Sequence, residues 1–223
     1  MPMGIRDLIK AIVPGSIRSS RLGKLVAHVT RSHDAVYDQY YYDSDVEVTS
    51  VQSAAIMAKS IVERFEPKTI IDVGCGTGAL LDAFRKLNCD VYGLEYSESG
   101  LAYCKRRQLP VRKFNIEKDQ IDTAQYDLAV SFEVAEHLPP WIADRFVGLL
   151  CKASPLVIIS AATPGQGGKD HVNEQPHAYW MEKFDRYGYF YDEGNSARLS
   201  AGWKLAGTAP WYSENVMVFV RRT

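Results

Sequence analysis

A glycine-rich segment in the first half of the chain carries the residues best suited to binding chemistry. Asp72 and Val73 are followed by Gly74, Gly76 and Gly78, and apolar residues flank the run on both sides. Glycines let a backbone turn sharply and approach a ligand closely. A helix that begins near Gly78 would present free N–H groups to a polar or anionic ligand. The segment therefore predicts a strand–turn–helix unit that holds a small molecule against its backbone.

A carboxylate downstream of this turn suits a nucleoside. Glu95 ends the next strand-like run, where it can accept hydrogen bonds from both ribose hydroxyls. Gly74, Gly76 and Ala79 also satisfy the G-x-G-x-x-G/A pattern of NAD- and FAD-binding proteins. The negative charge of Asp72 would face the pyrophosphate of a dinucleotide, whereas it suits an ammonium group. These residues favour a nucleoside cofactor that carries a positive charge.

Two later segments carry groups that can exchange protons or bind an acceptor. His137 lies five residues beyond the predicted strand end at Phe132 and can accept a proton near neutral pH; alternatively, Glu136 and His137 cap the next helix or line the cofactor. The segment 163–180 follows the fifth predicted strand and combines three glycines with polar residues that include His171. Such a loop favours acceptor recognition, and a solvated loop before a helix is the alternative.

These segments need a scaffold that brings strand ends to one edge. Apolar runs predict strands, and amphipathic stretches between them predict helices. The strands are Thr69–Val73, Val91–Tyr96, Val111–Ile116, Asp127–Phe132 and Leu156–Ala161, and the helices are Ala79–Leu87, Glu98–Arg107 and Trp141–Lys152. This alternation predicts a parallel sheet with helices on both faces, which binds ligands at the carboxyl ends of its strands.

The rest of the chain extends this pattern. Two short helices in the first third precede a helix predicted over Thr49–Phe65. The tail is predicted as a helix over Pro176–Tyr187, a strand over Tyr189–Asp192, a connector and a final strand over Val216–Val220. We divide the chain into an N-terminal helical cap, residues 1–66, and a ligand-binding domain, residues 67–223.

The composition bounds the class of protein. A formal net charge of -1 gives no strong signal for nucleic acid, and 46% hydrophobic with 24% charged residues is ordinary for a soluble domain. The four cysteines show no metal-binding spacing, and we expect them to be reduced thiols. No apolar run reaches the ~20 residues of a membrane span and no signal peptide is recognised, so a cytoplasmic location is expected. The basic residues among 1–33 leave a weak option of peripheral membrane contact.

The run from Asp72 to Gly78 closely resembles motif I of class I S-adenosylmethionine (SAM)-dependent methyltransferases. The resemblance extends through residues 93–97, 115–116 and 131–138, and covers roughly residues 50–160 plus the final strand. It implies an α/β fold, a three-layer Rossmann-like sandwich with a seven-stranded, mostly parallel sheet. Val216–Val220 would be its one antiparallel strand, and the N-terminal helices would form a cap.

The resemblance also implies a role for each matching residue. Asp72 and the turn would hold the methionine part of SAM, and Glu95 would bind the ribose. Asn115 stands at the position where the family usually has Asp, and its side chain would accept a hydrogen bond from the adenine amino group. The predicted cofactor-binding residues are Asp72, Gly74, Cys75, Gly76, Gly78, Glu95, Tyr96, Asn115, Ile116, Phe132 and Glu133. Tyrosines of the cap, Tyr37, Tyr40 and Tyr41, would reach the cofactor or a ring of the acceptor.

The leading function is transfer of a methyl group from SAM to a small acceptor, a hydroxyl of a sugar or natural product. The loop after the fifth strand resembles that of bacterial methyltransferases associated with glycans and natural products. His137 and His171 are the candidate catalytic residues, and no metal is expected. Acceptor identity, the acceptor atom and the oligomeric state are not given by the sequence.

Three alternatives stay open. Glu133, Glu136 and His137, with His171 or His177, resemble the cation site of the small-RNA 3′-terminal 2′-O-methyltransferases. That resemblance implies an RNA methyltransferase that depends on a divalent cation. A non-enzymatic SAM-binding regulator and an NAD(P)-dependent oxidoreductase are the other two.

Overall fold

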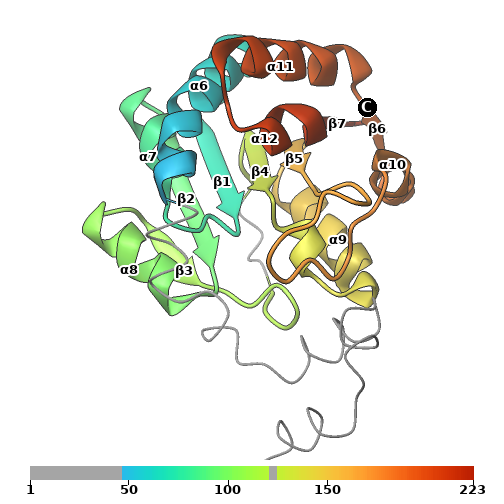
Figure 1. Cartoon of the computed structure of the whole chain (residues 1–223), viewed down its shortest axis with the longest axis horizontal. Coiled ribbons are helices and arrows are strands. Elements are labelled where there is room, and N and C mark those ends of the chain that lie inside the picture. Colours follow the sequence, from blue (N-terminus) through green and yellow to red (C-terminus); the bar gives the residue numbers. More distant parts are fainter. Residues whose placement is uncertain (1–46, 121–124) are drawn as a thin grey trace, which may run out of the picture.

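The strands of the computed structural model form one mixed sheet, in the order β3-β2-β1-β4-β5-β7-β6 (Figure 1). The structure describes residues 47–120 and 125–223. Strand β7 pairs antiparallel with β5 and β6, and the other described pairs are parallel. The predicted Rossmann-like sandwich, with one antiparallel strand inserted between its neighbours, is confirmed.

The described strands lie close to their predicted positions. They are β1 Thr69–Val73, β2 Asp90–Glu95, β3 Val111–Lys113, β4 Leu128–Phe132, β5 Leu156–Ser160, β6 Tyr189–Tyr191 and β7 Met217–Arg221. Strand β3 ends before the predicted Ile116, because the chain turns at Asn115. The Asn115 side chain accepts from the N–H of Glu117 at 2.8 Å, and the Asp119 carboxylate accepts from the N–H of Asn115 at 2.7 Å. A side chain that bonds its own backbone two residues on closes a turn in place of a strand ladder.

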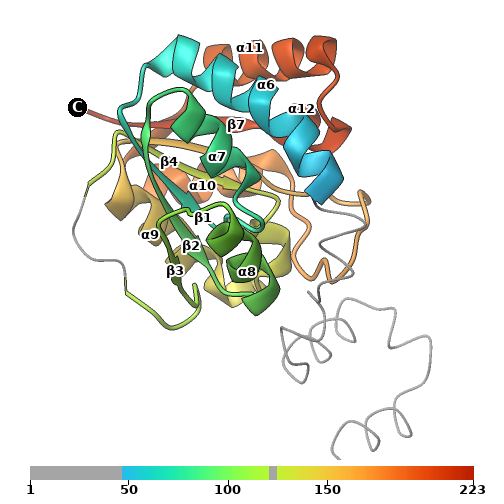
Figure 2. The same cartoon turned by 90° about the vertical axis from the view of Figure 1, so that its left-hand side faces the viewer.

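Helices cover both faces of the sheet (Figures 1 and 2). The described α-helices are α6 Glu47–Phe65, α7 Ala79–Lys86, α8 Glu98–Arg106, α9 Ala143–Ala153, α10 His177–Arg186, α11 Glu193–Ala206 and α12 Pro210–Asn215. One buried cluster joins α6, α7 and α11 to the sheet, and the other joins α9 and α10 to its opposite face. Successive strand residues serve opposite faces: Ile70 belongs to the first cluster and Ile71 to the second.

The prediction of a connector between β6 and β7 is wrong, because most of that segment forms the helices α11 and α12. Helix α11 begins after Asp192, whose carboxylate caps the N–H of Asn195 at 3.0 Å, and it ends at Gly207 with φ +79°. These are ordinary start and stop signals. The apolar periodicity between them is weak, since only Ser196, Leu199 and Trp203 of this helix are buried.

Helix α11 is held in place by α6, beside which it lies in both views (Figures 1 and 2). The buried indole of Trp203 donates to the hydroxyl of Ser60 at 2.7 Å. Arg64 donates to the side chain of Asn195 at 2.5 Å. These partners are far apart in sequence, so tertiary packing supplies what the local pattern of α11 lacks.

Residues 1–46 of the predicted cap lie outside the described part of the chain, and they include Tyr37, Tyr40 and Tyr41. Its remaining helix, α6, packs Met57, Ala58 and Ile61 against the sheet. Among the described residues, no helix is long and apolar enough to cross a membrane.

Candidate active site

The glycine-rich turn between β1 and α7 has the geometry that its sequence predicts. Gly74, Gly76 and Gly78 have φ of +81°, +53° and +75°, a region that residues with a Cβ rarely adopt. The N–H of Gly74 donates to the carbonyl of Leu94 at 2.7 Å, which ties the turn to the end of β2. A Cβ on Gly74 would lie 2.6 Å from a methyl of Val134. The turn therefore leaves no room for side chains at its first glycine.

Glu95 fixes the other side of the turn through its carboxylate. One oxygen accepts from the N–H of Gly76 at 2.7 Å, and the other accepts from the N–H groups of Tyr96 and Ser97 at 2.8 and 2.7 Å. A carboxylate has about four acceptor sites. These three bonds orient the group and leave acceptor capacity for a ligand.

Asp72 and Glu95 form a pair of buried acids, 3% and 7% exposed. Burial and the charge of Glu95 raise the pKa of Asp72 to about 8. Burial also raises the pKa of Glu95, against the opposing effect of its three backbone hydrogen bonds. Two buried acids on one site suit a cation and hydroxyl donors, and they disfavour a pyrophosphate.

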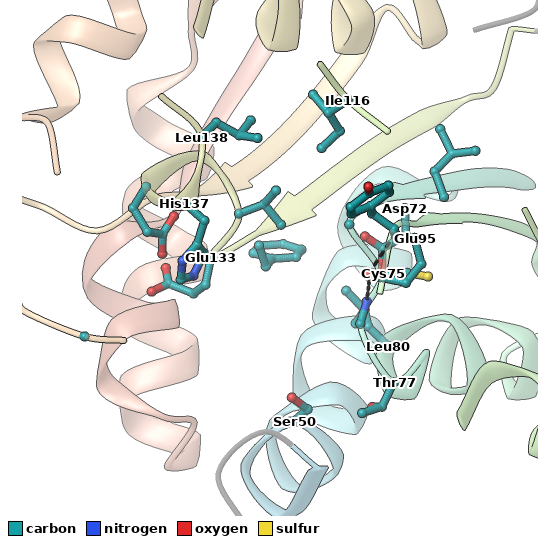
Figure 3. Close-up of a pocket in the computed structure, with 18 of the residues that line it drawn as sticks. Ser50, Asp72, Cys75, Thr77, Leu80, Glu95, Ile116, Glu133, His137 and Leu138 are labelled. Atoms are coloured by element: carbon teal, nitrogen blue, oxygen red, sulfur yellow. Dashed lines mark hydrogen bonds between the residues drawn. The ribbon is translucent and has the colours of Figure 1, made fainter. Parts of the chain in front are cut away.

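Both acids line a cavity of about 1030 Å³ that reaches from the turn to His137 (Figure 3). Its walls include Asp72, Gly74, Cys75, Gly76, Glu95, Tyr96, Asn115, Ile116, Phe132, Glu133, His137 and His171. Gly78 is the one predicted site residue outside these walls. A Cβ there would lie 2.5 Å from Leu109 and 3.0 Å from the Cys104 sulfur, so its place is set by packing.

The predicted adenine contacts lie together in this cavity. The side-chain oxygen of Asn115 already accepts from Glu117, so it serves the turn as well as the cavity wall. The ammonium of Lys113 lies 5.7 Å from the ring centre of Tyr96. Ile116 adds an apolar surface to the same wall.

At the opposite end, Glu133 follows β4 with a φ of +54°, a strained value for a residue with a side chain. Gln166 donates to its carboxylate at 3.1 Å and accepts from Asn215 of α12 at 2.7 Å. Burial raises the pKa of Glu133. Hydrogen bonds from the loop after β5 and from α12 therefore hold the carboxylate of Glu133 in the cavity wall, on a residue whose backbone is strained.

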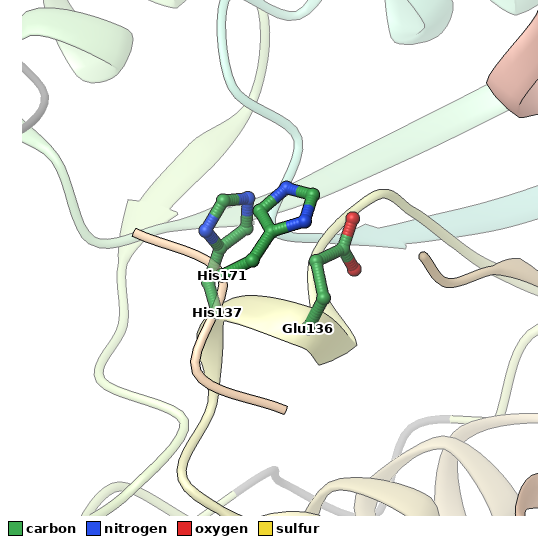
Figure 4. A group of neighbouring side chains, drawn as sticks. All are labelled: Glu136, His137 and His171. Atoms are coloured by element: carbon green, nitrogen blue, oxygen red, sulfur yellow. The ribbon is translucent and has the colours of Figure 1, made fainter. Parts of the chain in front are cut away.

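Beside it, Glu136, His137 and His171 lie within reach of one another (Figure 4). One nitrogen or oxygen from each falls within 4.8 Å of the others, and the two imidazole centres are 5.0 Å apart. The N–H groups of Val172 and Asn173 both donate to the carbonyl of Glu136 at 2.9 Å. These two bonds dock the loop after β5 on the turn after β4, and so bring the histidines together.

The carboxylate of Glu136 is fully buried, and within the described part of the chain neither of its oxygens has a hydrogen-bond partner. Burial and the nearby charge of Glu133 raise the pKa of Glu136 well above its usual range. His177, the other candidate ligand from the sequence, is not part of this group and does not line the cavity.

The ring of His171 is oriented by Glu174, whose carboxylate lies 3.0 Å from Nδ1. The same carboxylate accepts from the N–H groups of Gly165 and Gly167 at 3.0 and 2.8 Å. Although desolvation opposes it, these bonds and the His171 contact lower the pKa of Glu174. With Nδ1 directed to Glu174, the Nε2 atom of His171 remains for other contacts.

Several cavity residues were not predicted. Thr49 and Ser50 come from α6, Trp141 follows the His137 turn, and Trp211 and Tyr212 come from α12. Pro210, suited to a first helical position, was the available signal for α12. Its approach to the cavity depends on tertiary packing, in which the ring of Tyr212 meets Phe132 edge-on at 6.2 Å.

Comparison with known proteins agrees with this geometry. Residues 52–193 match the family described as "Methyltransferase domain". A probable S-adenosylmethionine-dependent methyltransferase of Mycobacterium tuberculosis is 25% identical over 123 residues, which make up 53% of this chain and 44% of that relative. The matched segment thus spans less than half of the relative's length.

Solved structures share the fold at low identity. Magnesium protoporphyrin IX methyltransferase from Synechocystis PCC 6803, with bound S-adenosylhomocysteine, superposes with a TM-score of 0.61 at 16% identity, over 96% of this chain and 100% of that one. The sugar N-methyltransferase KedS8 from Streptoalloteichus sp. superposes with a TM-score of 0.61 at 15% identity, over 86% of this chain and 94% of that one. Family match, sheet order and turn agree, and the chain belongs to the class I methyltransferases, enzymes that use SAM.

Proposed function

We propose that this methyltransferase transfers the methyl group to a hydroxyl of a small acceptor, a sugar or natural product. The observation that carries the proposal is a cavity of about 1030 Å³ whose two ends differ chemically. Ligand pockets commonly measure about 300–1,000 Å³, so this volume suits a cofactor together with a compact acceptor.

The end next to the turn suits SAM. In the proposal, Asp72 binds the ammonium group, the backbone of Gly74, Cys75 and Gly76 holds the methionine part, and Glu95 accepts from the ribose. The two buried acids support this assignment, because a bound cation would favour the ionised form of Asp72. Gly78 lies outside the cavity walls and packs against Cys104 of α8, so in the proposal it shapes the turn.

The adenine would lie along the wall formed by Tyr96, Asn115 and Ile116. Phe132 and Glu133 line the same cavity, and in the proposal they face the methyl group of SAM. SAM supplies the activated methyl group and the leaving group, so the chain's contribution is to orient both partners and exclude water.

The other end suits a polar acceptor. His137 and His171 are the proposed catalytic residues, because they are the imidazoles that line the cavity within residues 47–120 and 125–223 and can contact an acceptor hydroxyl. Trp141 and Trp211 line the same cavity and are 62% and 37% exposed, a placement suited to stacking on a ring. Structural neighbours that act on sugars, the sugar N-methyltransferase KedS8 and the amino pentose methyltransferase CalS10, support a sugar; the magnesium protoporphyrin IX enzyme supports a larger ring.

The test is release of S-adenosylhomocysteine from SAM in the presence of a panel of sugars, nucleotide sugars, phenols and short RNAs. We expect turnover with a member of the sugar or phenol groups, and at least a tenfold loss in kcat/KM for His137→Ala. His177→Ala is the matched control and should retain turnover within twofold. Turnover with RNA alone would overturn the proposed acceptor class, and failure of SAM to bind would overturn the assignment of the cofactor end.

A further inference from the structure

We infer that Glu136, His137 and His171 form a binding site for a divalent transition-metal cation at the acceptor end of the cavity (Figure 4). The site itself stands on these three residues, whereas its role toward the acceptor rests on the proposed function.

The ligand atoms are nearly close enough to share one ion. One donor atom from each residue lies within 4.8 Å of the others. Metal–nitrogen bonds of about 2.1 Å place ligands on opposite sides of one ion about 4.2 Å apart. Three atoms spaced 4.8 Å apart lie about 2.8 Å from a common centre, so inward shifts of about 0.7 Å by side-chain rotation bring them to coordination distance.

The carboxylate of Glu136 is buried beside that of Glu133, with which it interacts directly. It is 0% exposed, and among the described residues neither oxygen meets a hydrogen-bond donor. Leaving a carboxylate buried without partners is costly, and native proteins pair such groups or use them to coordinate metals. Glu133, three residues earlier, adds another buried oxygen, Oε1, without a described partner. A cation would compensate both carboxylates at once.

The surrounding contacts resemble the outer shell of a metal site. Histidine ligands commonly donate their second ring nitrogen to a carboxylate, which fixes the ring for the metal. His171 has this partner in Glu174, at 3.0 Å from Nδ1, and Glu174 is itself anchored by the N–H groups of Gly165 and Gly167. A Cβ on Gly168 would lie 2.3 Å from Nε2 of His171, so glycine is required for the loop to close over the ring.

The type of ligand selects the type of cation. Mg²⁺ and Ca²⁺ prefer oxygen ligands, whereas imidazole suits first-row transition metals. Two histidines and one or two carboxylates therefore favour Mn²⁺, Fe²⁺, Co²⁺ or Zn²⁺ over Mg²⁺. Three protein ligands leave coordination positions for an acceptor, and a bound cation lowers the pKa of a coordinated hydroxyl. With the cation bound, His137 and His171 would act on the acceptor through the cation, which would help the acceptor oxygen to lose its proton.

The test is a titration of the metal-depleted full chain with Mn²⁺. Binding is measured as the loss of the electron paramagnetic resonance signal of the free ion. We expect one Mn²⁺ per chain and at least a tenfold weaker affinity in each of Glu136→Gln, His137→Ala and His171→Ala. The matched control His177→Ala should bind Mn²⁺ within twofold of the unmodified chain. An excess of Mg²⁺ should not displace the bound Mn²⁺.

Two results would overturn the inference: no stoichiometric binding of Mn²⁺, Co²⁺ or Zn²⁺ at millimolar concentration, or binding that all three variants leave unchanged. Thermal stabilisation by SAM, measured on the same variants with and without chelator, verifies that each one folds. It also separates the two proposals, because loss of SAM binding concerns the cofactor end, and loss of Mn²⁺ binding with intact SAM binding concerns the cation site.

Discussion

The N–H of Gly76 donates to the carboxylate of Glu95 at 2.7 Å, a bond that joins the glycine-rich turn after β1 to the end of β2. The two residues come from different strand–loop units, and the bond fixes the distance between the two proposed contact points for the cofactor. The same carboxylate also holds the N–H groups of Tyr96 and Ser97. One side chain therefore shapes the backbone on both sides of the proposed SAM site.

Replacing Glu95→Gln should weaken SAM binding at least tenfold and lower the free energy of unfolding by about 1–3 kcal/mol. The amide removes the negative charge from three backbone hydrogen bonds, and bonds to charged groups are worth about 1.5–3 kcal/mol. Calorimetric titration and urea denaturation measure the two effects. Glu98→Gln, an exposed carboxylate paired with Lys113, is the matched control and should leave SAM affinity unchanged. An unchanged affinity in Glu95→Gln would refute the ribose assignment.

The stability of the ligand-free protein should fall as the pH rises from about 4 to 8, in part because of Asp72. Its pKa is raised in the folded state to about 8 from an ordinary value of 3.8. In this window the folded state holds a proton that the unfolded state has released, so raising the pH favours unfolding. The variant Asp72→Asn should lack this pH-dependent part of the free energy of unfolding. The stability of the variant relative to the unmodified chain should therefore increase toward pH 8 by about 1–3 kcal/mol.

Asp82 provides the control for this pH dependence. Although desolvation opposes it, hydrogen bonds from Lys86 and Arg85 lower its pKa, so its contribution is lost as the pH falls. Asp82→Asn should therefore show no gain in relative stability between pH 5 and 8 in chemical denaturation. A relative stability of Asp72→Asn that stays constant over this range would show that Asp72 is ionised in the free protein.

Replacing Gly74→Ala should destabilise the fold by about 1–3 kcal/mol, through a strained φ of +81° and a contact of 2.6 Å between the new Cβ and Val134. Val134→Ala removes the methyl groups responsible for the contact and leaves the backbone strain. The double variant should consequently recover at least 0.5 kcal/mol relative to the sum of the single changes. Strict additivity in denaturation experiments would assign the whole cost to the backbone.

Replacing Glu174→Gln should lower turnover about 10–100-fold and leave SAM affinity within twofold, because Glu174 positions His171 and does not line the cavity. Mn²⁺ affinity should fall in parallel, a readout that a general loss of stability would not produce. Glu182→Gln, an exposed partner of Arg186 on α10, is the matched control. Equal losses of SAM and Mn²⁺ affinity would contradict a positioning role.

Much of the cofactor end follows from local sequence. Strand β1, the turn and α7 are consecutive, and Glu95 ends the next strand, so apolar patterning and glycine positions predicted Asp72, Gly76 and Glu95 at the carboxyl ends of consecutive strands. The hydrogen bond between Gly76 and Glu95 shows that these ends meet. The positive φ of the glycines and the alternation of strands with helices are local properties of the backbone.

The acceptor end depends on contacts between distant segments. The sequence predicts that His137 and His171 follow consecutive strands. In the structure, two hydrogen bonds to the Glu136 carbonyl dock the loop that carries His171, so that the two rings meet and His177 is left out. Likewise, Trp211 and Tyr212 reach the cavity because α11 packs on α6 through Trp203 and Ser60. Loop docking and helix packing depend on shape and burial across the fold, which the pattern of residues within one segment does not encode.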